Sequence, residues 1–409
     1  MSVPAFSALR HRNFRLLWTG QLISVSGTMM QTAAILWHVS LLVSPERKAL
    51  ALGLVGLVRV VPIVAFSLFS GVVADVLDRR RLMLITQSAM ALLAGILAWL
   101  TFRGLSSVWP VYVLAALASA ASAFDAPARQ SLIPNLVPRE DLPNALSLNT
   151  IVFQAASVTG PSLAGLTISA AGVGWAYTFN ALSFLAVIVG LLLMRDVRPA
   201  SSTSTSDISL KAAMEGLRFV FAAPMIRSTM LLDFFATFFS SATALLPIFA
   251  QDVLKVGAHG YGVLYAAPSV GALVASLAMV RAVDTIERRG QTLLWSVAAY
   301  GAATVVFGLS RDFWLTFACL AATGAADTVS MVLRNIVRQL ETPDHLRGRM
   351  VGVNMVFFMG GPQLGELEAG LVANWWGPVA SVVSGGIGSL LATGWIAGAT
   401  PALRRYRRH

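Results

Sequence analysis

Twelve long apolar runs occupy most of this chain and restrict its fold more than any other feature. A helix needs roughly 20 apolar residues to cross a bilayer. Runs of this order lie at 14–43, 50–76, 82–102, 108–132, 145–170 and 174–194, and again at 226–251, 258–283, 290–310, 312–337, 348–375 and 378–399. They predict an all-α membrane protein with twelve transmembrane helices.

The composition favours a lipid environment over water. Only 12% of the residues are charged and 56% are hydrophobic, whereas soluble domains carry about 25% charged residues. The net charge of +11 comes from short basic clusters between the apolar runs, so nucleic acid is not an expected partner and the lipid bilayer is. The single cysteine, Cys319, lies inside an apolar run, which excludes a disulfide framework and a multi-cysteine metal site. No cofactor or metal is expected.

A polar stretch divides the apolar runs into two sets of six. It contains the tract Ser201–Asp207 and then an amphipathic segment, Leu210–Phe221, which could lie along the membrane surface or could lead into the seventh helix. The predicted organisation is an N-terminal six-helix bundle at 1–196, a cytoplasmic linker at 197–225 and a C-terminal six-helix bundle at 226–409.

The basic residues are distributed unevenly between the two sides of the membrane. If the N-terminus is cytoplasmic, most of the 30 Lys and Arg residues fall on the cytoplasmic side, and Arg59 lies within the second run. The opposite side then holds only Arg47, Lys48, Arg103, Lys255 and Arg311. By the positive-inside rule both termini are predicted to be cytoplasmic.

The two halves carry matching landmarks. The segment Ala74–Arg80 after the second run corresponds to Val283–Arg289 after the eighth, and both combine acidic and basic residues. At one constant offset, Arg129, Pro138 and Asn149 match Arg334, Pro343 and Asn354. A parallel repeat of six helices is the architecture of transporters that bind a small-molecule substrate between their halves near the membrane midplane. Because one chain carries both halves, a monomer is expected to suffice.

The motifs also resemble a known family. Gly71–Arg81 resembles the loop signature between helices two and three of the major facilitator superfamily, with Asp78 where that signature usually has glycine, and Gly160-Pro161 resembles its helix-five antiporter motif. Phe124–Leu142 and Gln363–Glu366 resemble the transmembrane secretion effector branch, which includes an exporter of the siderophore enterobactin. The resemblance spans nearly the whole chain. It implies proton-driven efflux of a siderophore or another amphipathic small molecule across a bacterial inner membrane.

Ionisable residues inside the runs are candidates for proton coupling, because a charge inside a bilayer costs about 2.5 to 3.5 kcal/mol on insertion scales. Glu366 ranks first, since it follows the Gly361-Pro362 pair by about one turn and is expected to face a cavity; Glu368 points elsewhere on the helix. Asp327 ranks second, beside small residues that leave room for solvent. Asp233 is expected to serve as a gate or linker contact as much as a proton carrier. Glu366 could instead be a structural partner of a buried cation.

Further candidates fall into three groups. Arg59 and Asp125 are predicted to form ion pairs or to line the substrate cavity, with Arg59 able to pair with an acid, meet a carbonyl or hold an anionic substrate. The pairs Gly160-Pro161 and Gly361-Pro362 are expected to mark helix bends that line a cavity or to act only in packing. The predicted cytoplasmic gate comprises Gly71, Asp75, Asp78, Arg79 and Arg80 and, in the second half, Asp284, Glu287, Arg288 and Arg289. His38 is a weaker proton-relay candidate, because a packing role fits it better.

These features predict a secondary active transporter, most simply a proton-coupled exporter that works by alternating access. A broad-specificity multidrug/proton antiporter and the uptake of a metabolite remain alternatives. A non-transporting membrane scaffold or sensor is the alternative of a different class, although a static scaffold has no need of a switchable gate. A channel is disfavoured, because polar residues are scarce in the runs. No Walker-type phosphate loop, HExxH, GxSxG or CxxC sequence is present, so no enzymatic activity is predicted.

Overall fold

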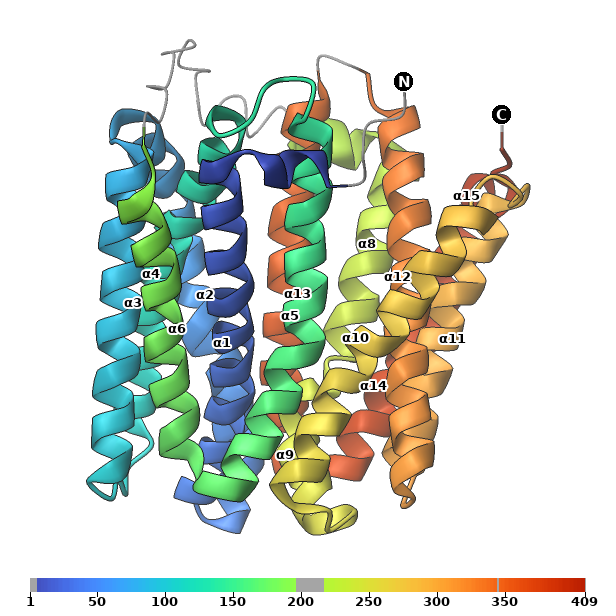
Figure 1. The fold of residues 1–409 in the computed structure, drawn as a ribbon. Coiled ribbons are helices and arrows are strands. Elements are labelled where there is room, and N and C mark those ends of the chain that lie inside the picture. Colours follow the sequence, from blue (N-terminus) through green and yellow to red (C-terminus); the bar gives the residue numbers. More distant parts are fainter. Residues whose placement is uncertain (1–5, 196–216, 344–345, 409) are drawn as a thin grey trace. The chain divides into compact units, whose positions relative to one another are not determined.

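A computed structural model describes residues 6–195, 217–343 and 346–408. Within these residues the chain is all-helical (Figure 1). The long helices are α1 (Arg12–Leu42), α2 (Pro45–Val76), α3 (Arg79–Phe102), α4 (Trp109–Leu132), α5 (Leu142–Ala171), α6 (Val173–Leu193), α8 (Pro224–Phe239), α10 (Gly257–Ala282), α11 (Arg289–Leu309), α12 (Phe313–Glu341), α13 (Arg347–Trp376) and α14 (Pro378–Ala399).

Short helical segments accompany them. They are η1 (Ser7–Arg10), η2 (Ile133–Asn135), η3 (Ala242–Leu245), α9 (Leu246–Ile248), η4 (Phe249–Val253) and α15 (Pro401–Arg405). Ten segments in the described part of the chain are long and apolar enough to cross a membrane, and α1 and α13 match them in length. The chain is a multi-pass membrane protein.

The ends of the long helices follow from local sequence. Asp78 and Asp312 cap α3 and α12, each by accepting a hydrogen bond from the backbone N–H three residues later, over 3.0 Å and 2.8 Å. The turns from α5 to α6 and from α13 to α14 each consist of one glycine, Gly172 with φ 91° and Gly377 with φ 87°. Such angles disfavour residues with a Cβ atom. The same turn therefore recurs at matching points of the sequence repeat.

The predicted seventh run, 226–251, differs from the structure because its helix is interrupted. The helix α8 ends at Phe239, and a 3₁₀ turn, a short α turn and a π turn complete the segment to Val253. Pro247 lies in the first turn of α9, a position where the N–H that proline lacks has no partner within the helix. Ser241 at the break donates a hydrogen bond of 2.9 Å to the Pro362 carbonyl.

The chain divides into two compact units. Unit 1 comprises Met1–Ser44, Val58–Ser201 and Val256–Ala266, and unit 2 comprises Pro45–Leu57, Ser202–Lys255 and Ala267–His409. The first part of α2 thus belongs to unit 2, and the first part of α10 to unit 1. The organisation into bundles at 1–196 and 226–409 with a linker at 197–225 stays a prediction.

Close contacts at glycine residues hold the first part of α2 in unit 2 and the first part of α10 in unit 1. In unit 2, a Cβ atom on Gly53 of α2 would lie 2.9 Å from the Cα of Gly370 in α13. In unit 1, a Cβ atom on Gly165 of α5 would lie 2.8 Å from the Cα of Gly262 in α10. Without glycine these backbones could not approach so closely.

Each unit has its own apolar core. In unit 1 the core includes Phe14, Leu17, Met83, Leu132 and Leu191. In unit 2 a corresponding cluster includes Leu232, Leu293, Val297, Leu333 and Leu403. Many other large apolar side chains are exposed, including Trp295 and Leu391, as expected for helices whose outer faces contact lipid.

Of the predicted linker, only residues from 217 onward are described; they form a helical turn at 217–222. Val220 in this turn is buried and packs in a cluster with Ile226, Met230, Met350 and Val353. The tract 201–207 and most of the predicted amphipathic segment lie outside the described residues.

Candidate functional site

A network of buried charged side chains lies inside unit 2. Asp233 projects from α8, and Asp327 and Arg334 project from α12. A single guanidinium nitrogen of Arg334, Nη2, lies 2.9 Å from Asp233 Oδ1 and 3.2 Å from Asp327 Oδ1. One arginine is therefore shared between two carboxylates on two helices.

A second arginine extends the network to a third helix. Arg338, one turn after Arg334 on α12, lies 3.4 Å from Asp233 Oδ2 through its Nη2 atom. The same nitrogen donates a hydrogen bond of 3.0 Å to the carbonyl of Thr229 in α8, and Nη1 donates to Asn354 Oδ1 in α13. The network thus connects α8, α12 and α13.

The two carboxylates differ in their access to solvent. The Asp233 side chain is 5% exposed, whereas that of Asp327 is 41% exposed. Asp327 lines a cavity of about 130 Å³ within unit 2. Hydroxyl groups dominate the polar part of its lining, which includes Ser240, Thr243, Tyr300, Thr304 and Thr323. A proton or water molecule in this cavity could reach Asp327, whereas Asp233 is covered.

Arg334 uses only some of its hydrogen-bond donors among the described residues. Arg334 is 1% exposed, and its Nε and Nη1 atoms have no hydrogen-bond partner among the described residues. Buried guanidinium groups are costly unless they are paired, so Arg334 depends on Asp233 and Asp327. Both carboxylates contact the same nitrogen of Arg334, and the other donors of its guanidinium group are left unused by the described residues.

Unit 1 holds its buried acid differently. Asp125 of α4 is 4% exposed. Its Oδ1 atom accepts hydrogen bonds of 2.9 Å from Thr86 Oγ1 and from Gln87 Nε2 of α3. Arg129, one turn later and matching Arg334 in the repeat, forms no ion pair with a described residue of unit 1. Neutral donors therefore satisfy the acid in this unit.

Glu366 lies in a tightly packed helix contact. A Cβ atom on Gly56 of α2 would lie 2.6 Å from Glu366 Oε2, and one on Gly53 would lie 2.8 Å from the Glu366 carbonyl oxygen. Its carboxyl group therefore lies against the α2 backbone inside unit 2. Glu368, two residues later, is half-buried.

Both Gly-Pro pairs lie where two helices approach closely. A Cβ atom on Gly160 of α5 would lie 2.5 Å from the Met29 Cβ atom of α1, and one on Gly361 of α13 would lie 2.5 Å from Thr237 Oγ1 of α8. Pro161 and Pro362 lie inside helices that continue past them. These contacts agree with the packing interpretation, and the cavity-lining role stays a prediction.

Arg59 and His38 occupy different environments. Arg59 is half-buried in α2, just after the point at which this helix passes from unit 2 to unit 1, and no described residue of unit 1 forms an ion pair with it. His38 is buried, and its Nδ1 atom lies 3.1 Å from the Tyr177 hydroxyl in α6. A packing and hydrogen-bonding role accounts for His38.

The basic residues of the predicted gate in unit 1 hydrogen-bond to helix ends. Arg79 donates a 2.9 Å bond to the Ser131 carbonyl at the end of α4, and Arg80 a 3.2 Å bond to the Leu192 carbonyl at the end of α6. Cations are favourable at helix C-termini. Asp78 caps α3. The surroundings of Gly71 and the side chain of Asp75 lie outside what the structure describes.

In unit 2 the corresponding motif binds the C-terminal segment. Arg408 contacts both the carbonyl and the carboxylate of Asp284, the latter at 3.8 Å, and its backbone N–H donates to the Glu287 carbonyl over 2.8 Å. Arg289 is buried, whereas Arg288 is exposed. The two halves therefore use the same motif for different contacts.

The sequence interpretation missed the role of Arg334 and Arg338. Both were assigned to the cytoplasmic side by charge counting, although Arg334 lies within the predicted tenth run, 312–337; α12 continues to Glu341 and buries both side chains. A signal was present. Asp327, Arg334 and Arg338 are spaced by seven and four residues, which puts them on one helix face.

The comparisons with known proteins agree with this architecture. The model of the transmembrane secretion effector family matches residues 3–406. The enterobactin exporter EntS of Escherichia coli O1:K1 is 26% identical over 408 residues, covering 97% of this chain and 94% of the relative. EntS of Shigella boydii serotype 18 is also 26% identical over the same length and coverage.

Solved structures share the fold. A POT family transporter superposes with a TM-score of 0.74 at 10% identity and 96% coverage of both chains. A bacterial homologue of the human lysosomal transporter Spinster gives 0.72 at 16% identity and 99% coverage of both chains. A bacterial homologue of the iron transporter ferroportin gives 0.70 at 17% identity, covering 95% of this chain and 98% of that one.

Proposed function

The chain belongs to the transmembrane secretion effector family, and from this premise we propose that it is a proton-coupled exporter of a siderophore or another amphipathic small molecule. Membership makes the chain a membrane transporter of the major facilitator type. The export of a siderophore is proposed from the printed function of its relatives, which export enterobactin.

The observation that carries the proton-coupling part is the sharing of Arg334 between Asp233 and Asp327 beside a cavity. When Asp327 is charged, Arg334 holds both acids. When Asp327 takes up a proton, its attraction to the guanidinium is lost, and Arg334 interacts with Asp233 alone. Protonation therefore changes how firmly α12 is attached to α8.

This change can be passed on through Arg338. Because Arg338 contacts Asp233, Thr229 and Asn354, a shift of Arg334 alters the partners available to Asp233 and so the contact with α13. Two arrangements of one ion-pair network are the kind of element that a transport cycle can bias. We assign the proton-carrying role to Asp327 and a positioning role to Asp233 and Arg338.

Glu366 ranks below Asp327 in this proposal, in contrast to the order expected from sequence. Its carboxyl group lies against the α2 backbone at Gly56, where a change of charge would have to disturb a close helix contact. It remains the second candidate. The cytoplasmic location of both termini and the gate role of the two charge motifs also remain parts of the proposal.

The test is uphill efflux from energised vesicles, for a panel of catecholate siderophores and lipophilic cations, with and without an uncoupler. We expect one class to be exported, the uncoupler to abolish its export, and Asp327→Asn to keep substrate counterflow while losing uphill movement. Asp312→Asn is the matched control, because Asp312 caps the same helix and asparagine caps equally well.

Other outcomes would redirect the proposal. Uphill transport that is normal in Asp327→Asn and lost in Glu366→Gln would move proton coupling to α13. Export restricted to lipophilic cations would favour a multidrug antiporter. An absence of counterflow for the entire panel would favour the scaffold or sensor alternative.

A further inference from the structure

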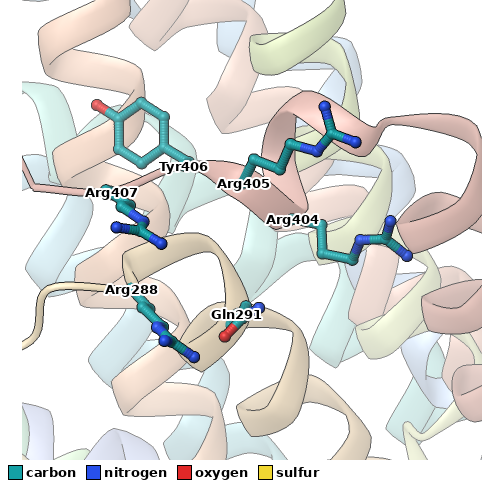
Figure 2. A pocket seen from close by; sticks show the side chains of 6 residues that line it. All are labelled: Arg288, Gln291, Arg404, Arg405, Tyr406 and Arg407. Carbon is teal, nitrogen blue, oxygen red and sulfur yellow. The ribbon is translucent and has the colours of Figure 1, made fainter.

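Four arginines surround one pocket at the end of unit 2 that carries the C-terminus. The pocket has a volume of about 380 Å³ and is lined by Arg288, Gln291, Arg404, Arg405, Tyr406 and Arg407. Figure 2 shows these side chains, contributed by the start of α11 and by the end of α15 with the residues after it.

The backbone around this pocket is held firmly. The N–H of Gly290 donates a hydrogen bond of 3.0 Å to the Tyr406 carbonyl. Leu403 is fully buried, and a Cβ atom on Gly290 would lie 1.7 Å from its carbonyl oxygen. Only glycine permits this contact between α11 and α15. The arginines are therefore presented by packed elements.

The charges of the pocket are not neutralised within the protein. Arg288, Arg404, Arg405 and Arg407 are all exposed, and none forms an ion pair with an acidic side chain in the part of the chain that the structure describes. Arg408, by contrast, is engaged by Asp284. Four exposed arginines lining one pocket make it strongly basic and favour an anionic ligand, and guanidinium binds phosphate well through its paired donors.

An apolar groove lies beside the pocket, along the membrane-spanning helices. It has a volume of about 430 Å³ and lies between α11 and α14, where it is lined mainly by Leu294, Trp295, Ala298, Leu390, Gly394 and Ala397. Gln291 and Arg404 line both the groove and the basic pocket. The two spaces are therefore neighbours at this end of the helices.

We propose that the pocket and the groove together bind one anionic glycerophospholipid. The phosphate would occupy the basic pocket and an acyl chain would occupy the groove. A free phosphate ion fits the same arginines but makes no use of the groove. Basic pockets at the ends of transmembrane helices are suited to anionic lipid headgroups, and the apolar groove next to the basic pocket favours the lipid over a free phosphate ion.

The experiment is native mass spectrometry of the full chain in detergent, with added phosphatidylglycerol or with phosphatidylcholine of the same acyl chains. We expect one phosphatidylglycerol to be retained in preference to phosphatidylcholine. The variant Arg404→Gln/Arg405→Gln/Arg407→Gln should weaken its retention by on the order of a hundredfold, since each cation near a bilayer surface contributes about a fivefold factor. Removal of exposed arginines should not impair folding.

A second variant tests the groove without changing the charge. No atom lies within 4 Å of a Cβ placed on Gly394, so Gly394→Leu should fold and fill the groove, and it should lower phosphatidylglycerol retention several-fold. Gly95→Leu in α3 of unit 1 is the matched control, because its Cβ also meets no atom within 4 Å. The control for charge is Arg12→Gln/Arg15→Gln/Arg139→Gln, which removes three exposed arginines from unit 1.

Three outcomes would overturn the proposal. Equal retention of the two lipids would exclude recognition of the anionic headgroup. Unchanged retention in Gly394→Leu, or an equal loss in the unit 1 triple variant, would indicate diffuse charge attraction. Displacement of the lipid by inorganic phosphate or glycerophosphoglycerol at concentrations matching the lipid would indicate a phosphate site that has no part for acyl chains.

Discussion

The two units bury acidic side chains at related places but stabilise them in opposite ways. In unit 1, Asp125 accepts hydrogen bonds from the neutral side chains of Thr86 and Gln87. In unit 2, Asp233 and Asp327 are held by the charged groups of Arg334 and Arg338. A neutral donor still binds a protonated acid, whereas a cation loses its electrostatic attraction to it. On the proposed function, this difference fits a fixed structural role for the polar core of unit 1 and a switchable role for the charged network of unit 2.

The strongest test of this comparison removes the shared cation. Arg334→Gln leaves Asp233 and Asp327 facing each other without a guanidinium between them, and the loss of one partner of a buried pair costs about 3–5 kcal/mol. We expect a large drop in the thermal unfolding temperature in detergent and no uphill transport. Arg129→Gln, at the matching position of unit 1, should change stability little. Equal effects of the two substitutions would contradict the proposed difference.

The next test exchanges each acid for its amide. Asp233→Asn removes the charge that Arg334 and Arg338 share, and should lower the free energy of unfolding by about 2–3 kcal/mol, as expected for a hydrogen-bonded charge that becomes unpaired. Asp125→Asn keeps an acceptor oxygen for Thr86 and Gln87, so a loss of about 1 kcal/mol or less is expected. Thermal unfolding of both variants in the same detergent gives the ratio of the two losses in unfolding free energy. A larger loss for Asp125→Asn would require an unrecognised cation in unit 1.

A third test separates stability from coupling. Asp327 is 41% exposed and Arg334 keeps Asp233 when Asp327 is changed, so Asp327→Asn should cost only about 1 kcal/mol. Its uphill transport should nevertheless be lost while counterflow persists. Parallel measurements of unfolding temperature and vesicle transport check this expectation. Loss of counterflow together with uphill transport would indicate a substrate-binding role instead.

The smallest effect on stability is expected at the surface pair of His11 and Asp141, which serves as a reference for the buried acids. The neighbouring Ser7 and His11 side chains lower the pKa of Asp141, and the His11 Nε2 and Asp141 Oδ2 atoms are 2.7 Å apart. A lowered carboxyl pKa stabilises the fold above the ordinary value of 3.8 and loses this contribution as the pH falls through the folded-state pKa. As the pH falls below about 4, the stability difference between the wild type and Asp141→Asn should therefore shrink progressively. A difference that does not shrink below this pH would assign the residue another role.

The helices could largely be predicted from sequence, because lipid requires long apolar helical segments and the chain shows them directly. The predicted run 82–102 is α3, and 378–399 is α14. The interruption after Phe239 was not predicted, although Pro247 was visible, because a proline inside a transmembrane run is compatible with a continuous kinked helix as well as with a break. Likewise, a Gly-Pro pair in the sequence predicts a close helix contact but does not identify the partner helix.

The candidate site was predicted only in part. Asp233 and Asp327 could be selected because a charge in an apolar run is costly, but their common partner could not, since Arg334 lies near the end of a run and also fits a cytoplasmic anchor. Glu366 could be found as an ionisable residue, yet its position against Gly56 depends on a contact between α2 and α13, which are far apart in sequence.

The sequence by itself determined the lipid environment of this protein, the expected number of helices and the internal repeat. Each of these follows from local composition and spacing. Only the tertiary structure decided which charged side chains form ion pairs. Arg334 contacts two acids, the matching Arg129 contacts none among the described residues of its unit, and the beginnings of α2 and α10 belong to the opposite units. Ion pairing and glycine contacts act between helices over a few ångströms, so only the packing of those helices, which the repeat does not specify, establishes them.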